Sequence, residues 1–240
     1  MGMKGMKKNE ENTGNPDFSA QLEQTANDYI FKKCLECGFD VEWREGFSVH
    51  LAACAELPTR FGTFVIAAFS EESNQKEHTA IVHGSVVGEQ DCPLRVHSQC
   101  HTGDVFNSLR CDCRSQLEAA LEYIASRPCG VVIYLKQEGR GIGLINKIRA
   151  YHLQDMGLDT VDANTCLGFP EDARDYRVAS EIIQLLRIRS IALLTNNPRK
   201  IKGLKKEGIT VTRRIPVLVG ETSFNKKYIQ TKRDRMGHLE

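Results

Sequence analysis

The residues best suited to chemistry are three cysteines in one short stretch, Cys100, Cys111 and Cys113. Cys111 and Cys113 alternate, so they do not easily close a disulfide on each other, but they can converge on a metal ion from a turn. Both precede a helix expected near Ser115, whose positive dipole end favours the metal-binding thiolate form. Three thiolates leave one tetrahedral position free, which is typical of a catalytic zinc site that activates water and polarises a substrate.

Two other interpretations of this cluster stay open. His97 and His101 are near in sequence and either one is able to fill the fourth position, which would make the site structural. Ordinary buried thiols would also explain the cluster, since free cysteine is among the most buried residue types. A separate pair, Cys34 and Cys37, has no second pair at zinc-ribbon spacing and favours structural or incidental thiols.

Two junctions between an expected strand and an expected helix have the composition of phosphate-binding loops. In the first, 137–143 (QEGRGIG), glycines let backbone amides approach an anion at a helix N-terminus, and Arg140 adds guanidinium donors. The second, 195–200 (TNNPRK), places hydroxyl and cationic side chains in a first helical turn. Each alone also fits an ordinary turn, because neither has a Walker or full dinucleotide pattern. Together they favour a polyphosphate ligand.

A third loop, 171–175 (EDARD), places acidic side chains and an arginine before the next expected helix. Asp172 and Asp175 are equally well explained as negative charges that stabilise a helix N-terminus. The composition of this loop therefore leaves its function open.

The elements that must position these residues alternate between strands and helices in the second half of the chain. Runs rich in apolar, β-branched and aromatic residues predict strands at 61–69, 79–87, 94–98, 131–135, 190–194 and 209–219. Apolar residues at helical spacing predict helices at 115–126, 144–156, 178–185 and 198–208. Ser115 and Glu118 fit a capping box, and Pro198 fits a first helical position. We expect an α/β fold, with a mixed β-sheet core flanked by helices and a strand-rich N-terminal half.

The composition excludes several classes of protein. The 240 residues are 41% hydrophobic and 26% charged, as in ordinary globular proteins. A net charge of +1 argues against a general nucleic-acid or membrane-surface binder. Apolar runs are far shorter than the roughly 20 residues of a membrane-spanning helix, and the N-terminus is no secretory signal. Nine irregularly spaced cysteines favour metal-binding or catalytic thiols over a disulfide framework, and hence a cytoplasmic protein.

Taken in order, these motifs resemble those of GTP cyclohydrolase II, the enzyme family that begins riboflavin biosynthesis from GTP. The resemblance covers roughly residues 57–240. Its motifs are 57–59 (LPT), 95–98 (RVHS), the three cysteines, 137–140 (QEGR), 146–151 (NKIRAY), 159–160 (DT), 172–175 (DARD), 195–198 (TNNP) and 236–239 (MGHL). So many motifs in register are more specific than any one alone. Gln99 departs from the pattern, because many relatives have an acid there.

The resemblance implies a role for many residues. Cys100, Cys111 and Cys113 would hold one zinc ion per subunit. Asp172 would be the proton acceptor, Arg174 would act at the α-phosphate, and Tyr151 would take part near the ring chemistry. The residues that would contact GTP are Arg95, Val96, His97, Ser98, Gln99, Gln116, Glu138, Gly139, Arg140, Thr160, Thr195 and Lys200.

The family reaction opens the imidazole ring of guanine, releases C8 as formate and cleaves diphosphate from the triphosphate. The product is 2,5-diamino-6-ribosylamino-4(3H)-pyrimidinone 5′-phosphate. Magnesium accompanies the triphosphate in this family, and the family precedent is a homodimer. Two alternatives are a variant that stops at the formylated pyrimidine and a zinc-stabilised GTP-binding module without turnover. A nucleic-acid-binding zinc protein is disfavoured by the balanced charge and the lack of paired C-x-x-C units.

Physical chemistry modifies two of these roles. A zinc ion with three thiolate ligands carries a net negative formal charge, which makes its water less acidic than at a three-histidine site, so a nearby acid or base is expected. A guanidinium stays protonated and is a poor nucleophile unless a base removes its proton. We therefore favour Arg174 as a group that stabilises charge developing on the phosphates.

Composition and the resemblance together predict the division of the chain. We expect a disordered tail at 1–20, an N-terminal extension at 21–56 with an amphipathic helix, and the catalytic domain at 57–225. The charged segment 226–240 is expected to be a mobile tail. The chain is too short for the dihydroxybutanone-phosphate synthase domain fused to this enzyme in some bacteria, so a monofunctional protein is expected.

Overall fold

A computed structural model describes residues 39, 44–220 and 222–239 of the chain. The tail expected at 1–20, most of the extension expected at 21–56 and the Cys34–Cys37 pair lie outside these residues. Within the described part, no helix combines the length and the apolar character that crossing a bilayer requires.

The core is one seven-stranded sheet in the order β1-β2-β3-β5-β4-β6-β7. Its strands are β1 (Val49–Thr59), β2 (Gly62–Glu71), β3 (Lys76–His83), β4 (Cys92–Ser98), β5 (Gly130–Leu135), β6 (Ile191–Leu194) and β7 (Val211–Ile215). Strands β1, β2, β3 and β5 pair antiparallel in that order. Strands β5, β4, β6 and β7 pair parallel. The expected mixed sheet with a strand-rich N-terminal half is confirmed.

Helices cover both faces of the parallel strands, which explains why β5 and β6 are almost continuously apolar. On one face, α2 (Cys113–Ala125) buries Ile124 against Val132 of β5. On the other face, α5 (Arg177–Leu185) and α6 (Pro198–Lys206) contribute buried side chains such as Ile182 to the larger apolar cluster. Full burial of one such isoleucine stabilises the fold by roughly 1.5–3 kcal/mol.

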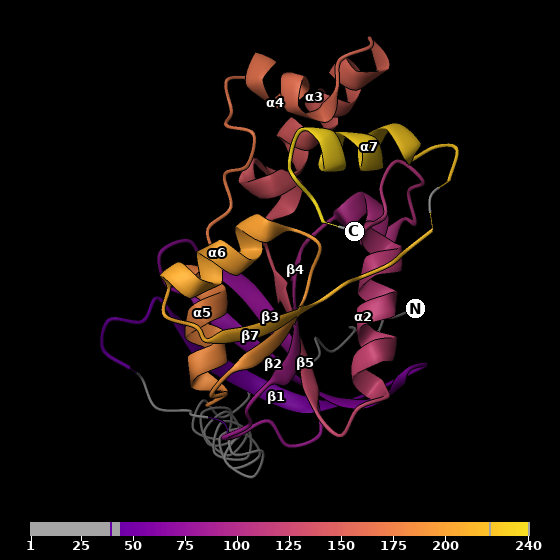
Figure 1. Cartoon of the computed structure of the whole chain (residues 1–240). Coiled ribbons are helices and arrows are strands. Elements are labelled where there is room, and N and C mark those ends of the chain that lie inside the picture. The colour runs from indigo at the N-terminus through magenta and orange to yellow at the C-terminus, as the bar shows by residue number, and fades with distance from the viewer. Residues whose placement is uncertain (1–38, 40–43, 221, 240) are drawn as a thin grey trace, which may run out of the picture.

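The strand order reverses at β4, because the next two strands of the parallel part, β5 and β6, lie on opposite sides of it. From β4 the chain passes through η1 (His101–Val105) and α2 to β5 on one side. From β5 it passes through η2 (Glu138–Gly141), α3 (Gly143–Asp155), α4 (Thr160–Cys166) and α5 to β6 on the other side. Such a switch point opens a crevice at the carboxyl ends of the strands, where ligands bind in α/β sheets. In Figure 1, α3, α4 and α7 (Lys226–Asp234) gather beyond one end of the sheet.

The start of α2 differs from the sequence-based expectation, and two further elements lie at expected domain boundaries. The capping box is wrong: α2 begins at Cys113 after Asp112, so Ser115 lies inside the helix and the Glu118 carboxylate pairs with arginines. Strand β1 runs through the boundary expected between residues 56 and 57. A helix, α7, lies in the segment for which a tail is expected. The first helical position of Pro198 is confirmed, with its neighbour Asn197 as the cap.

Candidate active site

One cavity at the carboxyl end of the parallel strands collects most of the residues that the sequence predicts as functional. The predicted residues that line it are Arg95, His97, Ser98, Gln99, Cys100, Cys111, Cys113, Gln116, Glu138, Gly139, Arg140, Tyr151, Thr160, Arg174, Thr195 and Lys200. Two predicted residues do not line it. The Val96 side chain packs in the larger apolar cluster, and Asp172 forms an ion pair with Arg174, which does line the cavity.

The three cysteine sulfurs converge at one end of this cavity, from η1 and from the start of α2. The Sγ atoms of Cys100 and Cys111 are 3.6 Å apart, and all three Sγ atoms lie within 4.8 Å of one another. A tetrahedral zinc ion with Zn–S bonds near 2.3 Å holds its sulfurs about 3.8 Å apart. The donor set and its spacing therefore fit zinc.

Gly103 makes this convergence possible. A Cβ at this position would lie 2.9 Å from Cys111 Sγ and 3.0 Å from Cys100 Sγ, closer than a real side chain allows. It would also meet the Cβ of Cys113 at 3.2 Å. A glycine in the turn of η1 is thus required for the sulfurs to approach one another.

Neither histidine considered as a fourth ligand joins the sulfur cluster. The Nε2 atom of His97 bonds to the Asp104 carboxylate at 3.2 Å, and the His101 ring packs edge-on against Phe106. In the part of the chain that the structure describes, the three cysteines form the one group spaced for a metal ion. Protein ligands therefore leave the fourth coordination position open, as in catalytic zinc sites.

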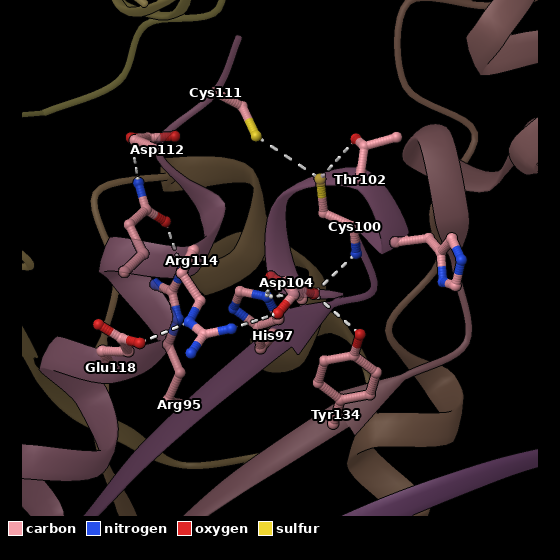
Figure 2. A network of polar contacts seen from close by, with 12 residues as sticks. Arg95, His97, Cys100, Thr102, Asp104, Cys111, Asp112, Arg114, Glu118 and Tyr134 are labelled. Carbon is pink, nitrogen blue, oxygen red and sulfur yellow. Dashed lines mark hydrogen bonds and ion pairs between the residues drawn. The ribbon is translucent and has the colours of Figure 1, made fainter. Parts of the chain in front are cut away.

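Asp104 fixes the loop that carries Cys100 (Figure 2). Its carboxylate accepts hydrogen bonds from the Cys100 backbone N–H at 2.9 Å and from the Tyr134 hydroxyl at 2.8 Å. Arg114 donates to the Asp104 carbonyl oxygen at 2.7 Å. Burial lowers the pKa of His97 despite the hydrogen bond that its ring makes to the Asp104 carboxylate, so the imidazole is neutral. Sequence reasoning missed Asp104, although it stands in the same short motif as Cys100.

A buried ion pair lies against the sulfurs. Lys147 of α3 donates to Cys100 Sγ at 3.1 Å and to Glu138 Oε1 at 2.7 Å. Burial disfavours its ammonium, but the Cys100 thiolate and the Glu138 carboxylate outweigh this and raise the pKa of Lys147. Hydrogen bonds from Cys111 and Cys113, together with Lys147, lower the pKa of Cys100. Lys147 stands in the 146–151 motif, but its residue type and position alone do not indicate a role.

Tyr151 lies beside the same sulfur. Its hydroxyl is 3.1 Å from Thr102 Oγ1, which is itself 3.8 Å from Cys100 Sγ. Burial raises the pKa of Tyr151, so the phenol is protonated at neutral pH. The side chain is therefore able to donate a hydrogen bond near the three cysteines.

Buried basic side chains also line the cavity. Lys200 donates to the Val96 carbonyl oxygen at 2.7 Å and is 5% exposed. Burial lowers its pKa strongly, and the neighbouring charges of Arg95 and Arg174 lower it further. Burial likewise lowers the pKa of Arg95 to about 10. Positive charges are costly to bury together, so this group of side chains is suited to a polyanion, which favours their charged forms.

Arg174 forms a two-pronged ion pair with Asp172. Its Nε and Nη2 atoms donate to the two carboxylate oxygens at 2.8 and 2.6 Å. Burial opposes both charges, but each partner outweighs it, so the pKa of Arg174 is raised and that of Asp172 is lowered. The carboxylate therefore holds the guanidinium in its charged form and does not deprotonate it.

The predicted phosphate loops meet at the cavity. In η2 the backbone of Gly139 and Arg140 is left-handed, with φ of 61° and 62°, a conformation that is uncommon for arginine. Gly141 packs against the backbone of Ala173, which joins this loop to the one that carries Arg174. In the second loop, Thr195 Oγ1 accepts from Asn197 N–H at 3.0 Å.

The C-terminal segment supplies lining residues that sequence reasoning missed: Tyr228, Lys232, Met236 and His238. Lys232 pairs with Asp112, between two of the cysteines, at 2.6 Å. Burial and the charge of Lys232 lower the pKa of His238 to about 3, so its ring is neutral. The motif at 236–239 was a signal for this part of the site, although the sequence assigned it no role.

A family model and the relatives with similar sequences carry the same description. A family model described as GTP cyclohydrolase II matches residues 50–216. The GTP cyclohydrolase-2 of Picrophilus torridus is 56% identical over 185 residues, covering 77% of this chain and 96% of that protein. That of Neisseria meningitidis serogroup C is 54% identical over 190 residues, covering 79% and 95%. That of Tolumonas auensis is 50% identical over 192 residues, covering 80% and 98%.

Proposed function

The chain belongs to the GTP cyclohydrolase II family, and we propose that it hydrolyses GTP to formate, diphosphate and 2,5-diamino-6-ribosylamino-4(3H)-pyrimidinone 5′-phosphate, the first committed step of riboflavin biosynthesis. The observation that carries this proposal is the composition of one cavity. Its walls hold three sulfurs spaced for zinc and, apart from them, a set of buried cations suited to a triphosphate. A purine nucleoside triphosphate combines a ring on which a metal centre can act with phosphates that buried cations can bind.

We place the guanine ring at the sulfur end. Zinc held by Cys100, Cys111 and Cys113 would supply a Lewis acid and lower the pKa of water for ring opening and formate release. The Tyr151 phenol lines the same cavity, and its hydroxyl is hydrogen-bonded to Thr102, a neighbour of the Cys100 sulfur. Tyr151 would orient the reacting ring through a hydrogen bond.

Unpartnered polar atoms support the predicted GTP contacts. Arg95 Nε, His97 Nδ1, Ser98 Oγ and Arg140 Nη2 are buried and make no hydrogen bond to the protein. Such groups are costly unless a ligand satisfies them. The other proposed side-chain contacts are Gln99, Gln116, Thr160, Thr195 and Lys200, all in the cavity wall.

Three predicted contacts would involve the backbone. Val96 packs its side chain in the core. Both Glu138 carboxylate oxygens bond within the protein, to Lys147 and to the His101 N–H. Gly139 has no side chain. For these residues we propose that peptide groups face the nucleotide.

Arg174 would stabilise the charge that develops when diphosphate leaves. Its ion pair with Asp172 keeps it protonated, which favours an electrostatic role over a nucleophilic one. Asp172 becomes free to accept a proton only when the guanidinium turns from it toward the phosphates. Arg174 would thus act first, at the phosphates, and Asp172 would then be free to accept a proton.

We further propose that Mg²⁺ accompanies the triphosphate, since Mg²⁺ is commonly bound through substrate phosphates. Mg²⁺ titration of GTP turnover at fixed zinc tests this, and turnover independent of Mg²⁺ would contradict it.

A homodimer is supported by exposed apolar side chains around η1 and on α3, including Phe106 and Ile145, which are 70% and 71% exposed. Sedimentation showing only monomers at micromolar concentration would exclude a homodimer.

The reduced cysteines that zinc requires support a cytoplasmic location. A periplasmic or secreted pool on cell fractionation would refute this location.

We propose residues 57–225 as the catalytic domain and 226–240 as a mobile segment. Because α7 and the residues after it line the cavity, movement of this segment would open it. Amide hydrogen exchange is expected to be fast in 226–239 without ligand and to slow at least about tenfold with a non-hydrolysable GTP analogue. Equal exchange in both states would contradict mobility coupled to binding.

A time course that follows formate and diphosphate separately tests the function. Purified protein with zinc is expected to release both from GTP, and a chelator should abolish formate release, with recovery on zinc addition. Diphosphate without formate would identify the variant that stops at the formylated pyrimidine. GTP binding without either product would identify a non-catalytic module.

A further inference from the structure

We propose that Lys147 is a positioning residue of the metal centre: its ammonium, hydrogen-bonded to the Cys100 sulfur, weakens electron donation from that sulfur and leaves the metal a stronger electrophile. This inference rests on the proposed function, because it requires a metal ion at the three cysteines. Neither the family pattern nor the sequence assigns Lys147 a role.

The contact is close and shielded from water. Lys147 Nζ lies 3.1 Å from Cys100 Sγ, and the lysine side chain is 11% exposed. Hydrogen bonds between a charged donor and a charged acceptor are the strong ones, and low local dielectric strengthens them further. The ammonium therefore acts on this sulfur as a nearby charge that solvent screens only weakly.

Glu138 holds the ammonium in place. One carboxylate oxygen accepts from Lys147 Nζ at 2.7 Å, and the other accepts at 2.5 Å from the backbone N–H of His101, the residue after Cys100. The first oxygen also accepts from the Gly139 N–H at 2.9 Å. The carboxylate is thus fully engaged inside the protein. It connects α3, the η2 loop and the cysteine loop at one point.

The backbone of η2 is shaped to allow this contact. A Cβ on Gly139 would lie 3.1 Å from the Cβ of Lys147, so a larger residue would push α3 away. The left-handed φ of 61° at Gly139 also favours glycine. The glycine predicted to serve phosphate binding therefore also lets Lys147 approach the sulfur.

The electrostatics explain why a cation belongs here. Three thiolates outweigh the charge of a divalent zinc ion, which makes the centre a poor electrophile. Hydrogen bonds to ligating sulfurs and other outer-shell partners tune a metal centre, and their loss typically costs about 10–100-fold in activity or affinity. Lys147 is placed to oppose the excess negative charge without occupying the open coordination position.

Cobalt(II) reconstitution of the full chain tests the inference without relying on turnover, because cobalt–thiolate centres absorb through sulfur-to-metal charge transfer. In Lys147→Met this band is expected to move to longer wavelength, since the Cys100 sulfur donates more strongly. Lys147→Arg keeps a cationic donor and should restore most of the wild-type position. Lys136→Met, which removes an exposed lysine at the end of β5, is the matched control and should leave the band unchanged.

With zinc, Lys147→Met is expected to lower kcat for formate release about 10–100-fold while KM for GTP stays within about twofold. An unchanged cobalt band in a folded, fully loaded Lys147→Met protein would overturn the inference, as would a rise in KM alone, which would make Lys147 a substrate contact. If this variant does not fold, Lys147→Gln replaces it, with a smaller shift expected in the same direction. Absence of any thiolate-to-cobalt band in the wild-type protein would instead refute the metal centre and the proposed function.

Discussion

Replacing Cys111 by serine is expected to remove the zinc ion and to lower formate release by about 10³-fold or more. The reason is that two remaining sulfurs cannot hold the tetrahedral site, and the metal supplies several kcal/mol of transition-state stabilisation at about 1.4 kcal/mol per factor of ten. Cys111 Sγ lies 3.6 Å from Cys100 Sγ, and the Cys111 side chain is only partly buried, so the substitution should leave the fold intact. Zinc per subunit and formate per minute are the quantities to measure.

Cys166→Ser provides the matched control for this variant. Cys166 is an exposed free cysteine in α4 that takes no part in the sulfur cluster. We expect it to keep full zinc content and full formate release. A correctly folded Cys111→Ser protein that releases formate at the normal rate would disprove the metal-dependent mechanism.

Replacing Arg174 by lysine is expected to preserve GTP binding and to lower diphosphate release by about 10²–10³-fold, the usual cost of losing one preorganised group that stabilises developing charge. Lysine keeps the positive charge beside Asp172, so the buried carboxylate stays paired and the fold is retained. It lacks the planar fork of donors that a guanidinium offers to phosphate oxygens. Binding is measured by calorimetry with a non-hydrolysable analogue, and release by a coupled diphosphate assay.

The exposed Arg177 at the start of α5 is the matched position for an arginine-to-lysine control. Its side chain is 52% exposed and its contact with Glu181 is long, at 4.0 Å. Arg177→Lys should behave as the wild type in both assays. Undiminished diphosphate release by Arg174→Lys would show that the guanidinium has no specific role.

The pairing of Arg174 with Asp172 also limits how the two residues can act. A carboxylate whose pKa is lowered by an ion pair is a weak base, and a guanidinium whose pKa is raised by the same pair is a weaker nucleophile still. The lowered pKa of Asp172 and the raised pKa of Arg174 both depend on this ion pair, so separation of the two side chains removes both shifts. Binding of the triphosphate would therefore prepare both residues at once, by drawing the guanidinium away from the carboxylate.

The fold class and most of the residues that line the cavity could be predicted from the order and types of the amino acids. Continuous apolar runs predict β5 and β6 because strands covered on both faces have no polar side, and this pattern is local. The cysteines and the two loops were found in the same way, since their residue types carry the chemistry whatever lies around them. The short helix α4 and the helix α7 were missed, because their helical pattern is short or mostly polar.

Contacts between residues far apart in the sequence depend on how the strands and helices pack, which the sequence pattern does not reveal. The contact of Lys147 with Cys100 joins residues 47 positions apart, and the pairing of Lys232 with Asp112 joins residues 120 apart. The packing of strands and helices also decided that Val96 points into the core and that His97 bonds to Asp104 and not to the metal site. The physical reason is that residue type sets what a side chain can do, whereas strand order and helix packing set where it lies. The crossovers on either side of β4 bring the cysteines, the cations and the C-terminal segment to one end of the sheet.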